Sequence, residues 1–522
     1  MIASWGSTSA RRVGVLLVAV LASTLAVSAT RRGGSRYVDT LLDAASDAPF
    51  PANATPTQNP IPTPHRVGTP PSPSSPVPQK RALTPDELAT LRRLDPDTFA
   101  RLPPEAGSWD PSRRNPCWRD AATGTPRCLP LYHVVGAWQS GGQDFNAKLA
   151  THPDVRFAPQ THFWNEDRPI DEYLARYDAF AREAMSDAAD ADESASASAS
   201  ASKSSAVVVG DPSPGVFANT WTESQRLHRT FKDVVATCWQ ACQSLPDEPP
   251  PGSPPGTPTE RRACVDGVDG DVDRVGCGEK AARADPPRES PGGHALSVPH
   301  LVRAAYGDVA DAVRVVAVFR EPRARTRAAF WHYEQYRRFF GDDEAGFSAF
   351  VDAFADAFES CEAEHGREGC AHRFEAYHPK YEAVFYHCDQ LIKSMYGTFA
   401  RGWLEMFGRE GFLALRSEDV FSQDQTVRVE QLRRAIRHLG LRELSDEKLR
   451  EMDASPGMEE DARLATRDGG ESDAAGGAGG RAGGGSVADP RAMARLAQIF
   501  EPEKRALAEM FQDEAFLWRD HE

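Results

Sequence analysis

The sequence carries no excess of positive charge. Its 522 residues include 60 Lys and Arg against 76 Asp and Glu, which gives a formal net charge of −16. This balance argues against nucleic acid as a partner and against a general polyanion-binding surface. A local basic patch could still form, and the candidates are Arg323, Arg325, Arg327, Arg337 and Arg338. The alternative for these side chains is an ordinary solvated helix face.

Recognisable metal motifs are also missing. The nine cysteines do not form closely spaced pairs followed by ligands at a zinc-like spacing. The run DGDVD contains Asp269, Asp271 and Asp273, but Arg274 stands where a calcium loop needs glycine, and no Glu follows at the bidentate position. The run also offers the Asp-x-Asp of a metal-dependent Golgi glycosyltransferase, without a preceding strand. The sequence therefore predicts no metal, and it keeps glycosyl transfer only as a minor alternative.

A nucleoside-triphosphate P-loop is absent as well. Leu131–Gly136 is predicted to be a strand, Ala137–Gln143 (AWQSGGQ) a small-residue turn, and Asp144–Leu149 the opening of a helix. The turn lacks the Gly-Lys-Ser/Thr ending, which argues against a kinase or ATPase. Its two glycines nevertheless allow backbone N–H groups to close around a phosphate.

A second strand-to-helix unit lies at Arg314–Tyr333, RVVAVFREPRARTRAAFWHY. Val315–Phe319 reads as a buried strand of a parallel sheet, and Pro322 suits the first turn of the following helix. Arg320 is thereby placed at the carboxyl end of a strand and beside a helix N-terminus. Open α/β sheets bind phosphorylated ligands at that position.

These units predict an α/β fold with a central parallel sheet of about four or five strands and helices on both faces. The acidic pair Glu418 and Asp419, which follows the last strand, is predicted to be structural rather than catalytic. The predicted strands are Tyr132–Val135, Val207–Val209, Val315–Phe319 and Phe412–Leu415.

The N-terminal region contains one long apolar run, Val13–Ala29. After a short tail at residues 1–12, this run predicts a transmembrane signal anchor, and a cleaved signal peptide ending at Ala29 is the alternative. Either reading places the remaining chain in the secretory lumen. Residues 30–115 are predicted to be a Pro-rich stem with a glycosylation sequon at Asn53 and helical signals over Leu83–Leu102.

Residues 116–522 are predicted to form one lumenal domain. Three low-complexity insertions are expected to be disordered surface loops within it, at residues 187–205, 245–293 and 468–485.

Several motifs, in order, resemble the Golgi carbohydrate sulfotransferases, in particular the N-acetylgalactosamine 4-sulfate 6-O-sulfotransferase type. The segments that carry the resemblance are Cys117–Gly136, Thr161–Trp164 (THFW), Val207–Phe217 (VVVGDPSPGVF), Arg320–Ala328, Asp389–Phe421 and Phe500–Trp518. The resemblance implies a P-loop-like sulfotransferase fold, a type II Golgi membrane protein and a glycan acceptor. It also implies sulfuryl transfer from 3′-phosphoadenosine 5′-phosphosulfate (PAPS) without a metal.

The resemblance also implies roles for individual residues. The 5′-phosphosulfate is expected on the turn residues Gln139, Ser140, Gly141, Gly142 and Gln143, and the 3′-phosphate on Arg320 and the Ala328 position. The expected catalytic residues are His162, Gln139 and Gln160.

The chain departs from this family at its chemistry. Gln139 stands where the family has Lys, Gln160 stands where it has Glu, and Ala328 stands where it has Ser. Gln139 cannot supply charge and Gln160 cannot act as a base, which leaves His162 as the candidate base. A degenerate member that binds glycan or nucleotide without turnover is therefore the main alternative.

Nine cysteines in a lumenal protein predict disulfides. Cys117 with Cys128 and Cys361 with Cys370 flank short turns, and both pairs match cysteine pairs of the family. Cys238 with Cys242 and Cys264 with Cys277 are the further pairs expected, with Cys388 left as the odd thiol.

Overall fold

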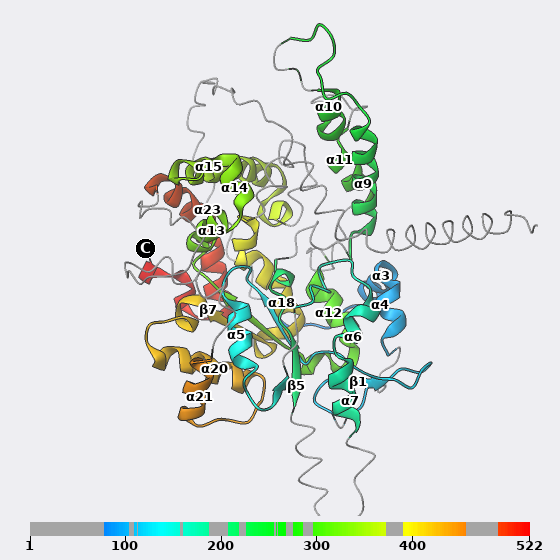
Figure 1. The fold of residues 1–522 in the computed structure, drawn as a ribbon, viewed down its shortest axis with the longest axis vertical. Coiled ribbons are helices and arrows are strands. Elements are labelled where there is room, and N and C mark those ends of the chain that lie inside the picture. The colour runs from blue at the N-terminus through cyan, green and yellow to red at the C-terminus, as the bar shows by residue number, and fades with distance from the viewer. Residues whose placement is uncertain are drawn as a thin grey trace, which may run out of the picture. The chain divides into compact units, whose positions relative to one another are not determined.

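A computed structural model describes most of the chain beyond residue 77 (Figure 1). All described residues belong to one compact unit, Ser74–Glu522. They are residues 78–103, 109–111, 113–156, 160–186, 207–218, 226–254, 257, 259–267, 275–285, 296–371, 390–455 and 489–521. Within these ranges, none of the helices combines the length and apolarity needed to span a bilayer.

Several predictions fall on residues outside this part of the chain. They concern the anchor Val13–Ala29, the sequon at Asn53, the insertions 187–205 and 468–485, the acidic run at Asp269–Asp273 and the thiol of Cys388.

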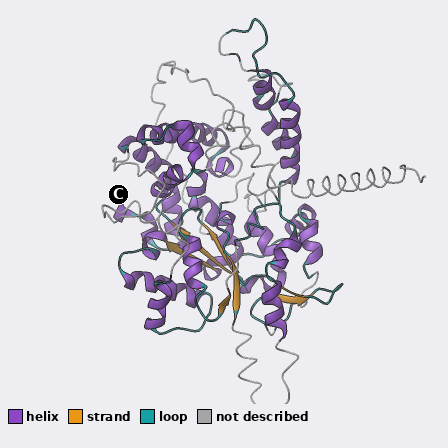
Figure 2. Cartoon of the chain, in the orientation of Figure 1, coloured by secondary structure: helices purple, strands orange, loops and turns teal. Residues whose placement is uncertain are grey.

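The core of the unit is a five-stranded, all-parallel sheet (Figure 2). This confirms the predicted α/β class and the four predicted strands, to which the structure adds one short edge strand. In spatial order the strands are β4 (Val155–Arg156), β5 (Val208–Asp211), β3 (Tyr132–Gly136), β6 (Arg314–Phe319) and β7 (Phe412–Arg416).

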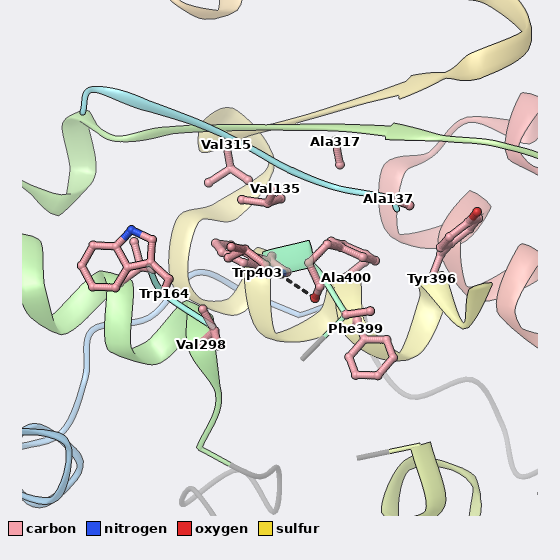
Figure 3. Packing of buried hydrophobic residues seen from close by; sticks show 14 of the residues in the cluster. Val135, Ala137, Trp164, Val298, Val315, Ala317, Tyr396, Phe399, Ala400 and Trp403 are labelled. Atoms are coloured by element: carbon pink, nitrogen blue, oxygen red, sulfur yellow. Dashed lines mark hydrogen bonds between the residues drawn. The ribbon is translucent and has the colours of Figure 1, made fainter. Parts of the chain in front are cut away.

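Alternate residues of each strand point to opposite faces of the sheet, and helices cover both faces. Val315, Ala317 and Phe319 join a core with α12 (Val298–Tyr306), α18 (Tyr396–Gly411) and α23 (Pro490–Phe511). Figure 3 shows Phe399, Ala400 and Trp403 of α18 in this core, with the Trp403 indole donating to the Phe217 carbonyl. Val316 and Val318 join the opposite core, with α5 (Gly142–Leu149), α20 (Gln425–His438) and α21 (Asp446–Asp453). Burial on both faces explains the continuous apolar strands.

The strand order creates a topological switch between β3 and β6. The chain leaves β3 for the β4 edge and returns to β5 beside β3. It then crosses to β6 on the other side of β3 and continues outward to β7. Connections that diverge from two neighbouring parallel strands leave a crevice at their carboxyl ends, where open α/β sheets bind ligands. The turn Ala137–Gly141 and Arg320 both lie at these ends.

The folded unit begins before the predicted boundary at residue 116. The helical signals of Leu83–Leu102 are confirmed as α3 (Pro85–Leu94) and α4 (Pro96–Arg101), with Thr84 and Glu87 forming a capping box. Leu91 is fully buried, and Arg81 pairs with Glu405 of α18. The stem prediction is therefore wrong for residues 78–103, because one face of α3 packs on the core.

The insertion at residues 245–293 contains two helices and is not simply a loop. α10 (Glu260–Asp266) and α11 (Cys277–Ala284) pack against α9 (Arg229–Gln243), and disulfides join them to it. The prediction of disorder is therefore wrong for the described part of this insertion. Polar composition concealed the helices because cross-links, rather than a large apolar core, hold them.

The disulfides correct two of the four predicted pairings. Cys117–Cys128 and Cys361–Cys370 form as expected, but the other bonds are Cys238–Cys277 and Cys242–Cys264. Cys238 and Cys242 lie one turn apart on α9, where Cβ atoms are about 5–6 Å apart, whereas a disulfide needs about 3.8 Å. The sulfurs of Cys238, Cys242 and Cys277 lie within 4.8 Å of one another. Because all three are in disulfides, they offer no thiolate to a metal.

The remaining elements connect these layers. They are β1 (Cys117–Arg119), β2 (Pro126–Cys128), α6 (Ile170–Ala175), α7 (Asp178–Ser186), α13 (Pro322–His332), α14 (Glu334–Phe340), α15 (Glu344–His365), α19 (Ser417–Val420), and the 3-10 turns η1 (Pro214–Val216), η2 (Gly307–Ala312), η3 (Ile392–Ser394), η4 (Glu514–Leu517) and η5 (Arg519–His521).

Candidate active site

The turn Ala137–Gly141 forms the first wall of the site. Its start is tied to the neighbouring strand, because the Ala137 N–H donates to the Val318 carbonyl at 2.7 Å. Gly141 has a φ of 82° and caps α5, and a Cβ there would lie 2.1 Å from the Phe421 ring. Only glycine fits both constraints. The turn therefore brings the N-terminal N–H groups of α5 to the crevice, which is a favourable place for an anion.

Gln139 is the predicted lysine replacement, and its side chain is held unusually. Its φ is 59°, a left-handed conformation that non-glycine residues rarely adopt. Its amide Nε2 and Oε1 are both buried, and neither has a hydrogen-bond partner within the described part of the chain. A buried amide without partners costs about 1–3 kcal/mol. A ligand in the crevice that bonded this amide would recover that free energy.

Arg320 forms the second wall, directly after β6. Gly136 of β3 pairs in register with Ala317, so both strands end at the same level. The Arg320 side chain is 4% exposed. Glu321 stabilises the start of α13, since its carboxylate accepts the Ala324 N–H at 2.8 Å. Arg320 therefore lies at a strand end beside a helix N-terminus, as the sequence predicted.

Two other predicted residues have different surroundings. Ala328 is buried on α13 at 7% exposure and can offer a ligand only its backbone and a methyl group. Glu418 accepts the Glu321 N–H and the Trp518 indole N–H, both at 2.8 Å. This confirms the prediction that the acidic pair has a structural role.

Gln160 and His162 form the third wall. The Gln143 amide donates to the Gln160 carbonyl oxygen, and the Gln160 amide nitrogen contacts His162 Nε2. An amide nitrogen can only donate, so Nε2 of His162 accepts and carries no proton. The structure thus brings the predicted residues of the turn and of the THFW segment into one hydrogen-bonded chain.

His162 is kept neutral by its surroundings. Burial lowers the pKa of His162; the carboxylate of Glu166 opposes this shift, and the cations of Arg168 and Lys393 add to it. A neutral imidazole can accept a proton from a hydroxyl group. The electrostatics therefore suit a base, although the Gln160 amide occupies the accepting nitrogen.

A buried network fixes the backbone at His162, which has a φ of 53°. Ser213 Oγ accepts the N–H groups of Thr161 at 3.1 Å and His162 at 3.0 Å, and it donates to Asp211 at 2.5 Å. Asp211 also accepts from Thr161 Oγ1 at 2.8 Å and from the Tyr173 hydroxyl at 3.2 Å. These contacts offset the cost of a left-handed residue and hold the imidazole at the crevice.

Sequence reasoning missed two residues of this site. The Trp138 ring lies 5.6 Å from the His162 ring, measured between centroids. On the same indole, Lys393 Nζ lies 5.4 Å from the ring centroid, and the indole N–H donates to the Tyr333 hydroxyl. Trp138 stood inside the predicted turn, so a large aromatic residue among small ones was an available signal. Lys393 gave none, because only the fold brings it close.

The predicted basic patch does not form. Arg325 is fully buried and donates to Ser394 Oγ and to the Gln390 side chain and carbonyl. The other four arginines lie within salt-bridge distance of carboxylates, in the pairs Arg323–Glu321, Arg327–Glu344, Arg337–Asp342 and Arg338–Glu334.

Comparisons with known proteins add little to this geometry. A scan against protein families finds no match, and a search of curated proteins finds no relative. Among solved structures, a sulfotransferase from Alicyclobacillus acidocaldarius is similar to this chain. The alignment covers 75% of this chain and 99% of that one, with 14% identity and a TM-score of 0.33. Similarity at this level does not establish a shared activity.

Proposed function

We propose that this protein is a sulfotransferase that moves a sulfuryl group from PAPS to a hydroxyl group of a glycan. One observation carries the proposal: the turn Ala137–Gly141, Arg320 and His162, which are distant in sequence, converge at the carboxyl ends of β3 and β6. These are the segments that the family resemblance assigns to the donor's two phosphate ends and to the acceptor hydroxyl.

The crevice offers a group for each end of the donor. The 5′-phosphosulfate would bind the N–H groups at the start of α5, with the Gln139 amide as a further donor. The 3′-phosphate would bind Arg320, whose guanidinium can form a bidentate pair with phosphate oxygens. The proposal needs no metal, because backbone dipoles and side-chain cations supply the electrostatic stabilisation.

The chemical step is an in-line displacement at sulfur. The acceptor oxygen forms a bond to sulfur while the bond from sulfur to the 5′-phosphate oxygen breaks, and the electron pair of that bond stays on the phosphate. The proton of the acceptor hydroxyl passes to Nε2 of His162. For this to happen the Gln160 amide must turn away, so that the hydroxyl group replaces it on the imidazole.

A protein that binds the donor without turnover is the second candidate. The specific observation in its favour is the closed chain Gln143–Gln160–His162, which occupies the only nitrogen available as a base. A carboxylate in place of Gln160 could take the proton directly, whereas the amide cannot.

The finer properties of the proposal follow the family resemblance. The acceptor would be a glycosaminoglycan-like or other polysaccharide, as for the N-acetylgalactosamine 4-sulfate 6-O-sulfotransferase type. The protein would face the Golgi lumen, anchored by residues 13–29, or would be secreted. The four disulfides support an oxidising compartment.

Donor binding tests the proposal directly. Titration calorimetry with adenosine 3′,5′-bisphosphate should show binding without metal, and Arg320→Ala should weaken it by about tenfold or more, the scale of a charge-assisted contact. Arg314→Ala is the matched control, since Arg314 begins the same strand at its opposite end. Unchanged affinity in folded Arg320→Ala would refute the assignment of the 3′-phosphate site. Transfer of radiolabelled sulfate from PAPS to chondroitin or dermatan then separates an enzyme from a binding protein.

A further inference from the structure

A short turn carries Lys393 to the site from a distant part of the chain. η3 (Ile392–Ser394) is fixed on α13, because Ser394 Oγ accepts from Arg325 Nε at 2.5 Å and lies 3.1 Å from Thr326 Oγ1. The same hydroxyl lies 3.3 Å from the carbonyl oxygen of Pro322, in the first turn of α13. Arg325 also bonds Gln390, so the whole approach to η3 is anchored behind the Arg320 corner.

The side chain of Lys393 points into the site and not toward solvent. Lys393 is 8% exposed, and its Nζ lies 5.4 Å from the ring centroid of Trp138. Trp138 precedes Gln139 in the turn proposed to hold the phosphosulfate, and its ring also contacts His162. The positive charge reaches the imidazole as well, because it helps to lower the pKa of His162.

We infer that Lys393 supplies the positive charge at the 5′-phosphosulfate that Gln139 cannot supply. The inference rests on the proposed function. Charge that develops on the leaving phosphate needs a cation or strong donors in a closed site. A lysine has a flexible four-carbon stem, so its ammonium group can move from the indole face to a phosphate oxygen. A lysine lost from the turn is thereby replaced by one from the turn before α18.

Two nucleotides test this without requiring turnover. Adenosine 3′,5′-bisphosphate carries the 5′-phosphate, and adenosine 3′-monophosphate lacks it. Lys393→Gln should weaken the bisphosphate by about tenfold or more, a charge-assisted contact, and leave the monophosphate within about twofold. Arg320→Ala should weaken both nucleotides alike. The ratio of the two dissociation constants is the readout, because general damage to the fold affects both.

Two variants guard against a merely structural effect. Lys393→Arg keeps the charge and should keep the ratio within about threefold of the wild-type value. Lys148→Gln removes a lysine from the far end of α5, where it pairs with Asp453, and should leave the ratio unchanged. If PAPS is a substrate, Lys393→Gln should lower kcat by about a hundredfold.

The outcomes separate this inference from the function on which it rests. If the wild-type protein binds neither nucleotide, the proposed function fails and the inference fails with it. If the wild-type protein binds both nucleotides but Lys393→Gln leaves the ratio unchanged, the inference alone is refuted. A collapsed ratio in Lys393→Gln together with a preserved one in Lys393→Arg supports it.

Discussion

The buried carboxyl of Asp211 should make the stability of this protein depend on pH in a way that Asp211→Asn removes. Asp211 is 1% exposed at the end of β5, and its oxygens accept from Ser213, Thr161 and Tyr173. Burial raises the pKa of Asp211 from its ordinary value of 3.8 to about 6, although the hydrogen bonds from these hydroxyls oppose the shift.

The direction and size of the effect follow from this pKa. A group whose pKa is raised by folding contributes stability that is fully present below its unfolded pKa, near 4, and that is lost as the pH rises through the folded pKa, near 6. A shift of about two pKa units corresponds to about 3 kcal/mol, at about 1.4 kcal/mol per unit. Relative to Asp211→Asn, the wild-type protein should therefore lose about 3 kcal/mol between pH 4 and pH 7.

The wild-type profile alone would not reveal this loss. Burial lowers the pKa of His133 to about 3 and that of His438 to about 4, and it also lowers the pKa of His162. Histidines with lowered pKa values lose stability as the pH falls below about 6.5, which is the opposite trend in the same window. Their contributions cancel in the difference between wild type and Asp211→Asn.

The assay is urea denaturation of both proteins, followed by tryptophan fluorescence at intervals from pH 4 to pH 7. Asp171→Asn on α6 serves as the control for loss of a surface carboxylate, because the Asp171 side chain is 55% exposed. Parallel curves for wild type and Asp211→Asn would refute the assignment of a raised pKa to this carboxyl. A difference that grows toward acid would reverse its sign.

Two further predictions concern the missing charges and the support of the site. If the wild-type protein binds PAPS but transfers slowly, Gln139→Lys with Gln160→Glu should raise the rate by about 10³; if it is already fast, His162→Ala should abolish transfer, and radiolabelled sulfate transfer decides between the two. Arg226→Met should lower the free energy of unfolding in urea by about 3–5 kcal/mol, because it leaves the fully buried Asp95 without its partner at 3.1 Å. A loss below about 1 kcal/mol for Arg226→Met would contradict that account.

Local patterns were sufficient to predict the sheet and its ligand-binding edge. The apolar run Val315–Phe319, followed by Pro322, predicted β6, the start of α13 and the place of Arg320. Thr84 and Glu87 likewise predicted the cap of α3. These features depend on neighbouring residues, through burial periodicity, fixed φ angles and hydrogen bonds within one turn. The extent of the folded unit was missed, since packing of α3 on α18 involves residues far apart in sequence.

Only the tertiary structure decided how the candidate site is assembled. The contact of Gln143 with Gln160 and His162 depends on how the turn and the following loop meet. The pairing Cys238–Cys277 depends on the helical geometry of α9, which forbids a bond within one turn. Lys393 reaches Trp138 because Ser394 docks on α13. The sequence by itself determined which chemistry each segment could offer, whereas long-range packing determined which groups meet, because residues distant along the chain become neighbours only when the core closes.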